Sequence, residues 1–129
     1  MTTRSEKSLQ QEQLMGSQVP SARICPEYEY TDGQDAVKVL SIGRLYADPW
    51  QSNILDDWMG RSDVETWSSR ACGLSVPRQN GKTCITSGRI VAGMVLYHEW
   101  VIYTAHLQKT ATETFMEIKG IFETRGLRK

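Results

Sequence analysis

The stretch VPRQNGKT, residues 76–83, decides how this chain is interpreted. It follows a short apolar run, residues 71–76, and it precedes a segment, 82–96, whose apolar residues recur near helical spacing. A strand, a tight turn with Gly-Lys-Thr and a helix together form the layout of a phosphate-binding loop. In that layout the backbone N–H groups and the helix dipole attract an anion. The sequence therefore predicts a nucleotide site at this turn.

The residue types of the turn fit phosphate chemistry. Lys82 is expected to reach the β- and γ-phosphates, and the Thr83 hydroxyl is expected to hold Mg²⁺. The usual motif begins with a glycine where this sequence has Val76. A polar turn between a strand and a helix is the alternative interpretation, because Gly-Lys-Thr also occurs by chance. A lysine directly after the turn glycine, at a helix N-terminus, favours phosphate binding.

A second apolar run, Trp100-Val101-Ile102-Tyr103, predicts another strand over residues 100–104. A strand at 71–76, a helix at 82–96 and this strand form a βαβ unit, which is parallel and right-handed almost always. The predicted fold class is α/β, a partial P-loop NTPase with a parallel-sheet core and flanking helices. The flanking helices are expected over 33–43, where Gly43 is the stop, from Pro49 onward, and over 109–124.

Length and composition limit the number of domains and the class of protein. Its 129 residues suffice for one small domain. Residues 1–22 are polar and are predicted to be a disordered tail, and residues 23–129 are predicted to form the domain. The net charge is zero, so the overall charge gives no indication of nucleic-acid binding. Three scattered cysteines indicate a reducing compartment, and no signal peptide or membrane span is expected.

Three segments together resemble the ATPase domain of a tailed-phage terminase large subunit. The first is the loop VPRQNGKT, and the second is VIYTAH at residues 101–106, followed by Lys109-Thr110-Ala111 and Phe115. The third lies upstream, DPWQ at residues 48–51 with Ile54-Leu55, and is similar to the adenine-recognition segment of that family. The resemblance covers roughly residues 35 to 122, and this family's loops often deviate at the position of Val76.

The resemblance implies roles for individual residues. Trp50 and Gln51 would contact adenine, Gln51 through an amide that offers both a donor and an acceptor. Arg78 would sense or stabilise the γ-phosphate. The resemblance leaves the role of His106 open. The full nucleotide-binding set is Trp50, Gln51, Arg78, Gln79, Asn80, Gly81, Lys82 and Thr83, and Thr83 would bind Mg²⁺ through the nucleotide.

The acidic motif of such an ATPase is missing. Turnover needs an apolar strand that ends in Asp-Glu, and no such run follows the loop. Asp56 and Asp57 precede the loop and are interpreted as the solvated face of a helix. No catalytic residue is identified, and the carboxylate cluster of the terminase nuclease is absent as well. The chain is therefore expected to be the N-terminal piece of the ATPase domain, binding ATP and Mg²⁺ without turning ATP over alone.

Two other functions stay open at this point. One is a fragment of a helicase-like P-loop ATPase, because helicases also place a glutamine segment before the loop. The other is a non-catalytic remnant whose loop no longer binds nucleotide. In a full-length terminase the partners would be double-stranded DNA, the small terminase subunit and the portal. That resemblance also implies a phage or prophage protein in the bacterial cytoplasm that forms an oligomer only in the assembled motor.

Overall fold

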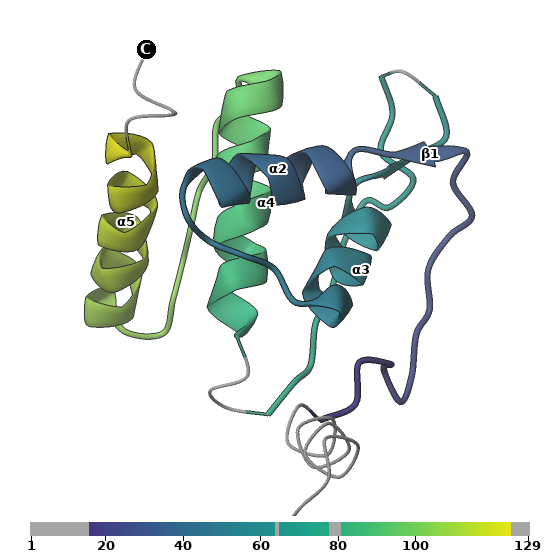
Figure 1. Cartoon of the computed structure of the whole chain (residues 1–129), viewed down its shortest axis with the longest axis horizontal. Helices are drawn as coiled ribbons and strands as arrows, with labels where there is room; N and C mark the ends of the chain where they lie inside the picture. Colours follow the sequence, from purple (N-terminus) through teal and green to yellow (C-terminus); the bar gives the residue numbers. More distant parts are fainter. Residues whose placement is uncertain (1–15, 64, 78–80, 125–129) are drawn as a thin grey trace, which may run out of the picture.

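The computed structural model describes residues 16–63, 65–77 and 81–124. A two-residue strand β1 (Tyr30–Thr31) is followed by the helices α2 (Gly33–Ile42) and α3 (Pro49–Trp58). A second short strand, β2 (Gly60–Arg61), precedes α4 (Lys82–Tyr97) and α5 (Gln108–Glu123). Figure 1 shows α2 crossing α4, with α3 beside the lower half of α4 and α5 standing apart at the C-terminal end.

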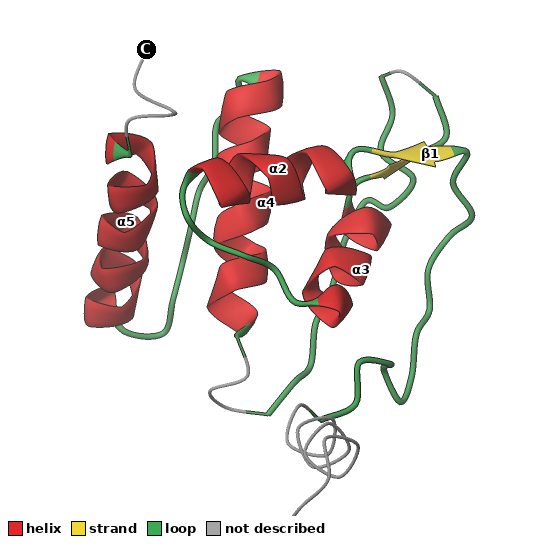
Figure 2. Ribbon diagram, in the orientation of Figure 1, coloured by secondary structure: helices red, strands yellow, loops and turns green. Residues whose placement is uncertain are grey.

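The predicted α/β fold, a P-loop NTPase core with a parallel sheet, is wrong for this chain. The described part is mostly helical, and its sheet is a two-stranded antiparallel pair with Tyr30 opposite Arg61 (Figure 2). Residues 71–76 and 100–104, predicted to be strands, form no regular structure. Neither segment exchanges a backbone hydrogen bond with another described segment. A strand exists only through its ladder, so β-suited composition without a partner leaves an open, exposed segment.

The predicted helices are confirmed. Pro49 begins α3, where its fixed φ suits a first helical residue. α2 ends at Ile42, and the N–H of Gly43 donates to the carbonyl of Val39 as the helix stops. α4 starts at Lys82, and α5 extends over the expected range. These helices follow the apolar periodicity because each buries one face.

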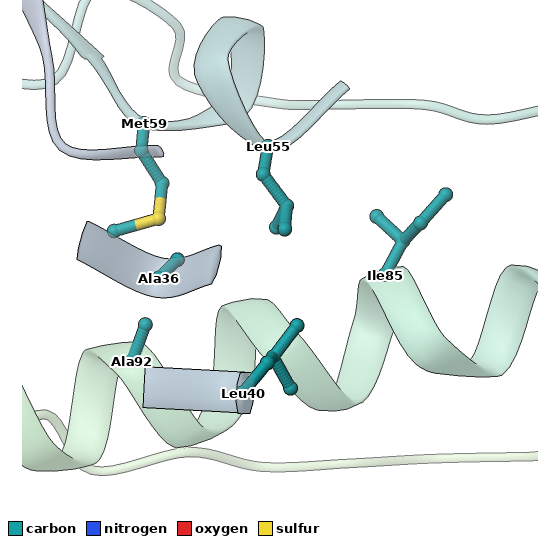
Figure 3. Packing of buried hydrophobic residues seen from close by; sticks show 6 residues of the cluster. All are labelled: Ala36, Leu40, Leu55, Met59, Ile85 and Ala92. Carbon is teal, nitrogen blue, oxygen red and sulfur yellow. The ribbon is translucent and has the colours of Figure 1, made fainter. Parts of the chain in front are cut away.

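The core lies where α2, α3 and α4 meet. Figure 3 shows Leu40 and Ala36 from α2 facing side chains of the other two helices. The cluster consists of Ala36, Leu40, Leu55, Met59, Ile85 and Ala92, each fully buried. Gly33 lets α2 approach α3 closely, because a Cβ there would lie 2.4 Å from the backbone nitrogen of Asp56. A smaller cluster of Val39, Val91 and Ile121 attaches α5.

A buried cation fixes the strand pair to the C-terminal end of α4. The Arg61 guanidinium lies 4.1 Å from the ring centre of Trp67 and 4.7 Å from that of Tyr97. Its Nε pairs with an Asp32 carboxylate oxygen at 2.7 Å, and the Tyr97 hydroxyl donates to the same oxygen. Burial and then this hydrogen bond raise the pKa of Tyr97 to about 12. The charged and polar groups of this cluster bind one another, so the cluster has a structural role.

Candidate functional site

The candidate site is the N-terminus of α4. Gly81 occupies the left-handed region, with φ 75° and ψ 20°, directly before the helix. Lys82 and Thr83 are the first two helical residues, and both are exposed. The first turn of α4 carries no acidic residue, so the partial positive charge of its free N–H groups is not offset there. The geometry suits an anion in front of the helix.

A buried glutamine connects α3 to this turn. The Nε2 of Gln51 donates a hydrogen bond to the carbonyl oxygen of Gly81 at 2.9 Å. The Oε1 of the same amide accepts from the backbone N–H of Asp48 at 2.7 Å, which stabilises the start of α3. Gln51 is 5% exposed, so both bonds form away from water. The residue predicted to read adenine thus contacts the glycine of the predicted phosphate loop directly.

Only glycine fits at position 81. Its positive φ is strained for other residues, and an added Cβ would lie 2.5 Å from the Nε2 of Gln51. The same Cβ would lie 3.9 Å from the Cζ2 atom of Trp50. Trp50 is half-buried and packs against the core, so its ring borders the turn from the α3 side. The structure therefore brings together Trp50, Gln51 and Gly81, and Lys82 and Thr83 follow directly in the first turn of α4.

An open cleft of about 1210 Å³ lies beside this turn. One wall is α3, including Trp50 and Gln51, and a second wall is the extended segment 69–77. The third wall is the N-terminal segment 16–25. Gly81 lies at the edge where the cleft meets the start of α4. The volume is ample for a nucleotide base and sugar, because ligand pockets usually span about 300–1,000 Å³.

The two acids of α3 have structural partners. Asp57 accepts two hydrogen bonds from Arg23, each 2.7 Å long, and these bonds lower the pKa of its carboxyl group. Asp56 accepts from the Gln34 amide, while its burial raises its pKa. Both side chains are half-buried and engaged, where the sequence suggested a solvated face. Among the described residues no group of three or more His, Cys, Asp or Glu side chains could hold a metal ion.

Three predicted site residues, Arg78, Gln79 and Asn80, lie outside the described residues. Their predicted roles stay predictions. His106 is exposed in the segment before α5, and no hydrogen bond or ion pair joins it to another described residue. Lys82 and Thr83 are the described side chains that could hold phosphate and Mg²⁺ at this turn.

Sequence reasoning did not find the third wall of the cleft. The carbonyl oxygen of the Gln18 side chain accepts the backbone N–H of Trp50 at 3.4 Å, and Arg23 pairs with Asp57. These contacts join residues about thirty positions apart that belong to no motif. No local signal in a single sequence could have paired them.

Comparisons with protein-family models, with curated proteins and with solved structures find no match to this chain. No helix in the described part of the chain is long and apolar enough to cross a membrane.

Proposed function

We propose that this chain binds ATP at the N-terminus of α4, as the nucleotide-binding portion of a tailed-phage terminase large subunit. The observation that carries the proposal is the hydrogen bond from Gln51 to the carbonyl oxygen of Gly81. Two segments that the terminase resemblance relates to one ligand, thirty residues apart in sequence, are in direct contact. The contact places the predicted adenine-binding residue beside the glycine that directly precedes Lys82.

Each residue has a distinct part in the proposal. The free N–H groups of the first turn of α4 and the ammonium of Lys82 hold the phosphates. The Thr83 hydroxyl contributes a ligand to Mg²⁺ that the nucleotide brings with it. Trp50 supplies an apolar face for the base. The Gln51 amide keeps one N–H and one lone pair beyond its two observed bonds, which an adenine edge could use.

Binding without turnover is the form of the proposal that the residues support. A terminase motor needs a carboxylate to orient Mg²⁺ and the attacking water. Among the carboxylates that line the cleft, Asp56 and Asp57 on α3 are engaged with Gln34 and Arg23. In a complete motor the chain would act in the host cytoplasm with double-stranded DNA, the small subunit and the portal.

The test is ATP binding by the purified full chain with and without Mg²⁺, measured by calorimetry. Lys82→Ala should abolish binding, since it removes the charge that faces the phosphates. Lys109→Ala is the matched control, because Lys109 is also an exposed lysine in the first turn of a helix, α5. GTP should bind more weakly than ATP if Gln51 reads the base.

Four outcomes would redirect the assignment. Equal ATP affinity in Lys82→Ala and the wild type would refute the phosphate site. Equal affinity for ATP and GTP, unchanged by Gln51→Ala, would remove the adenine role and leave a general phosphate site. Hydrolysis that Lys82→Ala removes would show that an unrecognised acid completes an active ATPase. Absence of any nucleotide binding would favour the non-catalytic remnant.

A further inference from the structure

The N-terminal strap, defined as residues 16–25, is attached to α3 at two points. Near the start of α3, the Oε1 of Gln18 accepts the N–H of Trp50 at 3.4 Å. Near the end of α3, Arg23 forms a two-bond ion pair with Asp57, with both nitrogen–oxygen distances at 2.7 Å. Tyr28 adds a hydrogen bond to the same carboxylate at 3.3 Å. The strap is therefore anchored at both ends of the helix.

The chain between the anchors is longer than the helix it spans. Five residues from Gln18 to Arg23 can extend over roughly 17 Å. The seven-residue path from Trp50 to Asp57 along α3 covers only about 10 Å. The strap has room to arch away from the helix, and Figure 1 shows it standing off α3. Strap residues and α3 residues line the same cleft.

The exposed surface of the strap matches a flat, partly apolar ligand. Val19 and Pro20 line the cleft, and Val19 is 75% exposed. Trp50 and Gln51 line the same cleft from α3, beside Gly81. A base whose phosphates sit at the start of α4 would enter between these walls. Such a base would remove apolar surface of the strap from water, which is favourable.

We propose that the strap is the outer wall of the purine site and that the Arg23–Asp57 ion pair is the latch holding it in place. This inference rests on the proposed nucleotide site at α4. With the latch closed, the base is enclosed between Trp50 and the strap. With the latch open, the phosphates still bind but the base loses one wall. The latch is partly exposed, since the Arg23 side chain is 56% exposed and that of Asp57 is 18% exposed.

The experiment uses trypsin cleavage after Arg23 in the full chain, followed by mass spectrometry. Without nucleotide, Asp57→Asn should speed this cleavage by about two- to fivefold, the range expected for a partly exposed ion pair. Asp35→Asn is the matched control, because it removes a carboxylate from the exposed pair of Asp35 with Lys38 on α2. ATP should slow cleavage after Arg23 in the wild type and in this control.

Affinity provides the second readout. Arg23→Gln should weaken ATP binding by about two- to fivefold and leave binding of inorganic triphosphate unchanged. This variant changes the exposed partner, so it keeps the test decisive if Asp57→Asn disturbs α3. The charge-swapped pair Arg23→Asp with Asp57→Arg should recover most of the lost affinity.

The outcomes separate the two proposals. If ATP binding depends on Lys82 but ATP does not protect Arg23 and Arg23→Gln binds normally, the strap inference is wrong and the site stands. If both ATP and triphosphate weaken equally in Arg23→Gln, the strap acts on the phosphates and the purine-wall assignment is overturned. If no binding depends on Lys82, the proposed function fails and the strap inference fails with it.

Discussion

Replacing Gln51 by glutamate and by alanine tests the contact on which the nucleotide site depends. Gln51→Glu keeps an acceptor for the N–H of Asp48 and loses the donor to the Gly81 carbonyl, whereas Gln51→Ala loses both bonds. Each buried bond contributes on the order of 1 kcal/mol, and a buried group left unpaired costs about 1–3 kcal/mol. We expect unfolding free energies lowered by about 1–2 kcal/mol for Gln51→Glu and about 2–3 kcal/mol for Gln51→Ala.

Thermal unfolding followed by circular dichroism measures these losses. For a chain of this size, 1 kcal/mol corresponds to a shift of roughly 4 °C in Tm. Gln34→Ala is the control, because Gln34 is an exposed glutamine of α2 whose bonds to Asp56 involve neither Gln51 nor Gly81. That control should stay within about 0.5 kcal/mol of the wild type.

The pH dependence of Tm distinguishes the loss of the hydrogen-bond donor in Gln51→Glu from a general loss of packing. A protonated glutamic acid can donate to the Gly81 carbonyl as the amide does. The difference in Tm between Gln51→Glu and the wild type should therefore shrink as the pH falls to about 4, near the usual carboxyl pKa. The difference for Gln51→Ala should not shrink. If both variants match the wild type, or if glutamate and alanine behave alike at every pH, Gln51 does not support Gly81.

Three further predictions address the packing and its electrostatics. Gly33→Ala should lower the free energy of unfolding, measured in urea, by about 1–3 kcal/mol, because the added Cβ would overlap the α3 backbone. The matched variant Gly120→Ala places its Cβ in open space on α5 and should raise the free energy of unfolding by about 0.5–1 kcal/mol. Arg89 lowers the pKa of Glu99 in the folded state, chiefly by hydrogen bonding. The pair therefore stabilises the fold fully above the unfolded-state pKa of Glu99, about 4.3, and this stabilisation is lost as the pH falls through the lower pKa of the folded state. Glu99→Gln should therefore flatten the acid limb of unfolding free energy against pH, and an unchanged limb would contradict the assignment. Ile102→Asp should change the unfolding free energy by less than about 0.5 kcal/mol, because that side chain is 92% exposed; a larger loss would mean that residues 100–104 pack against another part of the chain.

The helices could be predicted because their signals are local. Pro49 and Gly43 mark where a helix starts and stops, and the apolar spacing around Leu40 and Ile85 marks the face that packs. Each of these signals lies within a few residues of the structure it specifies. A single sequence therefore carries enough information to place all four segments as helices.

The predicted strands were wrong because strand formation does not depend on local signals alone. Residues 71–76 and 100–104 have the composition of buried strands, but a strand requires a partner from elsewhere in the chain. In the described structure Trp100 is fully exposed and Ile102 nearly so, which is the reverse of a sheet interior. The composition of a segment shows that it could form a strand beside a partner strand, but it does not show whether that partner is present.

The site shows where local and non-local information meet. The loop pattern placed Gly81, Lys82 and Thr83 at a helix start, and the structure agrees. Their support differs from the prediction. A parallel sheet was expected to hold the turn, whereas here the turn is held by α3, which packs on α4 through Leu55 and carries Gln51 to Gly81. The geometry of the candidate nucleotide site therefore depends on the contact between these two helices, and any change that loosens their packing must also loosen the turn at which we propose that the phosphates bind.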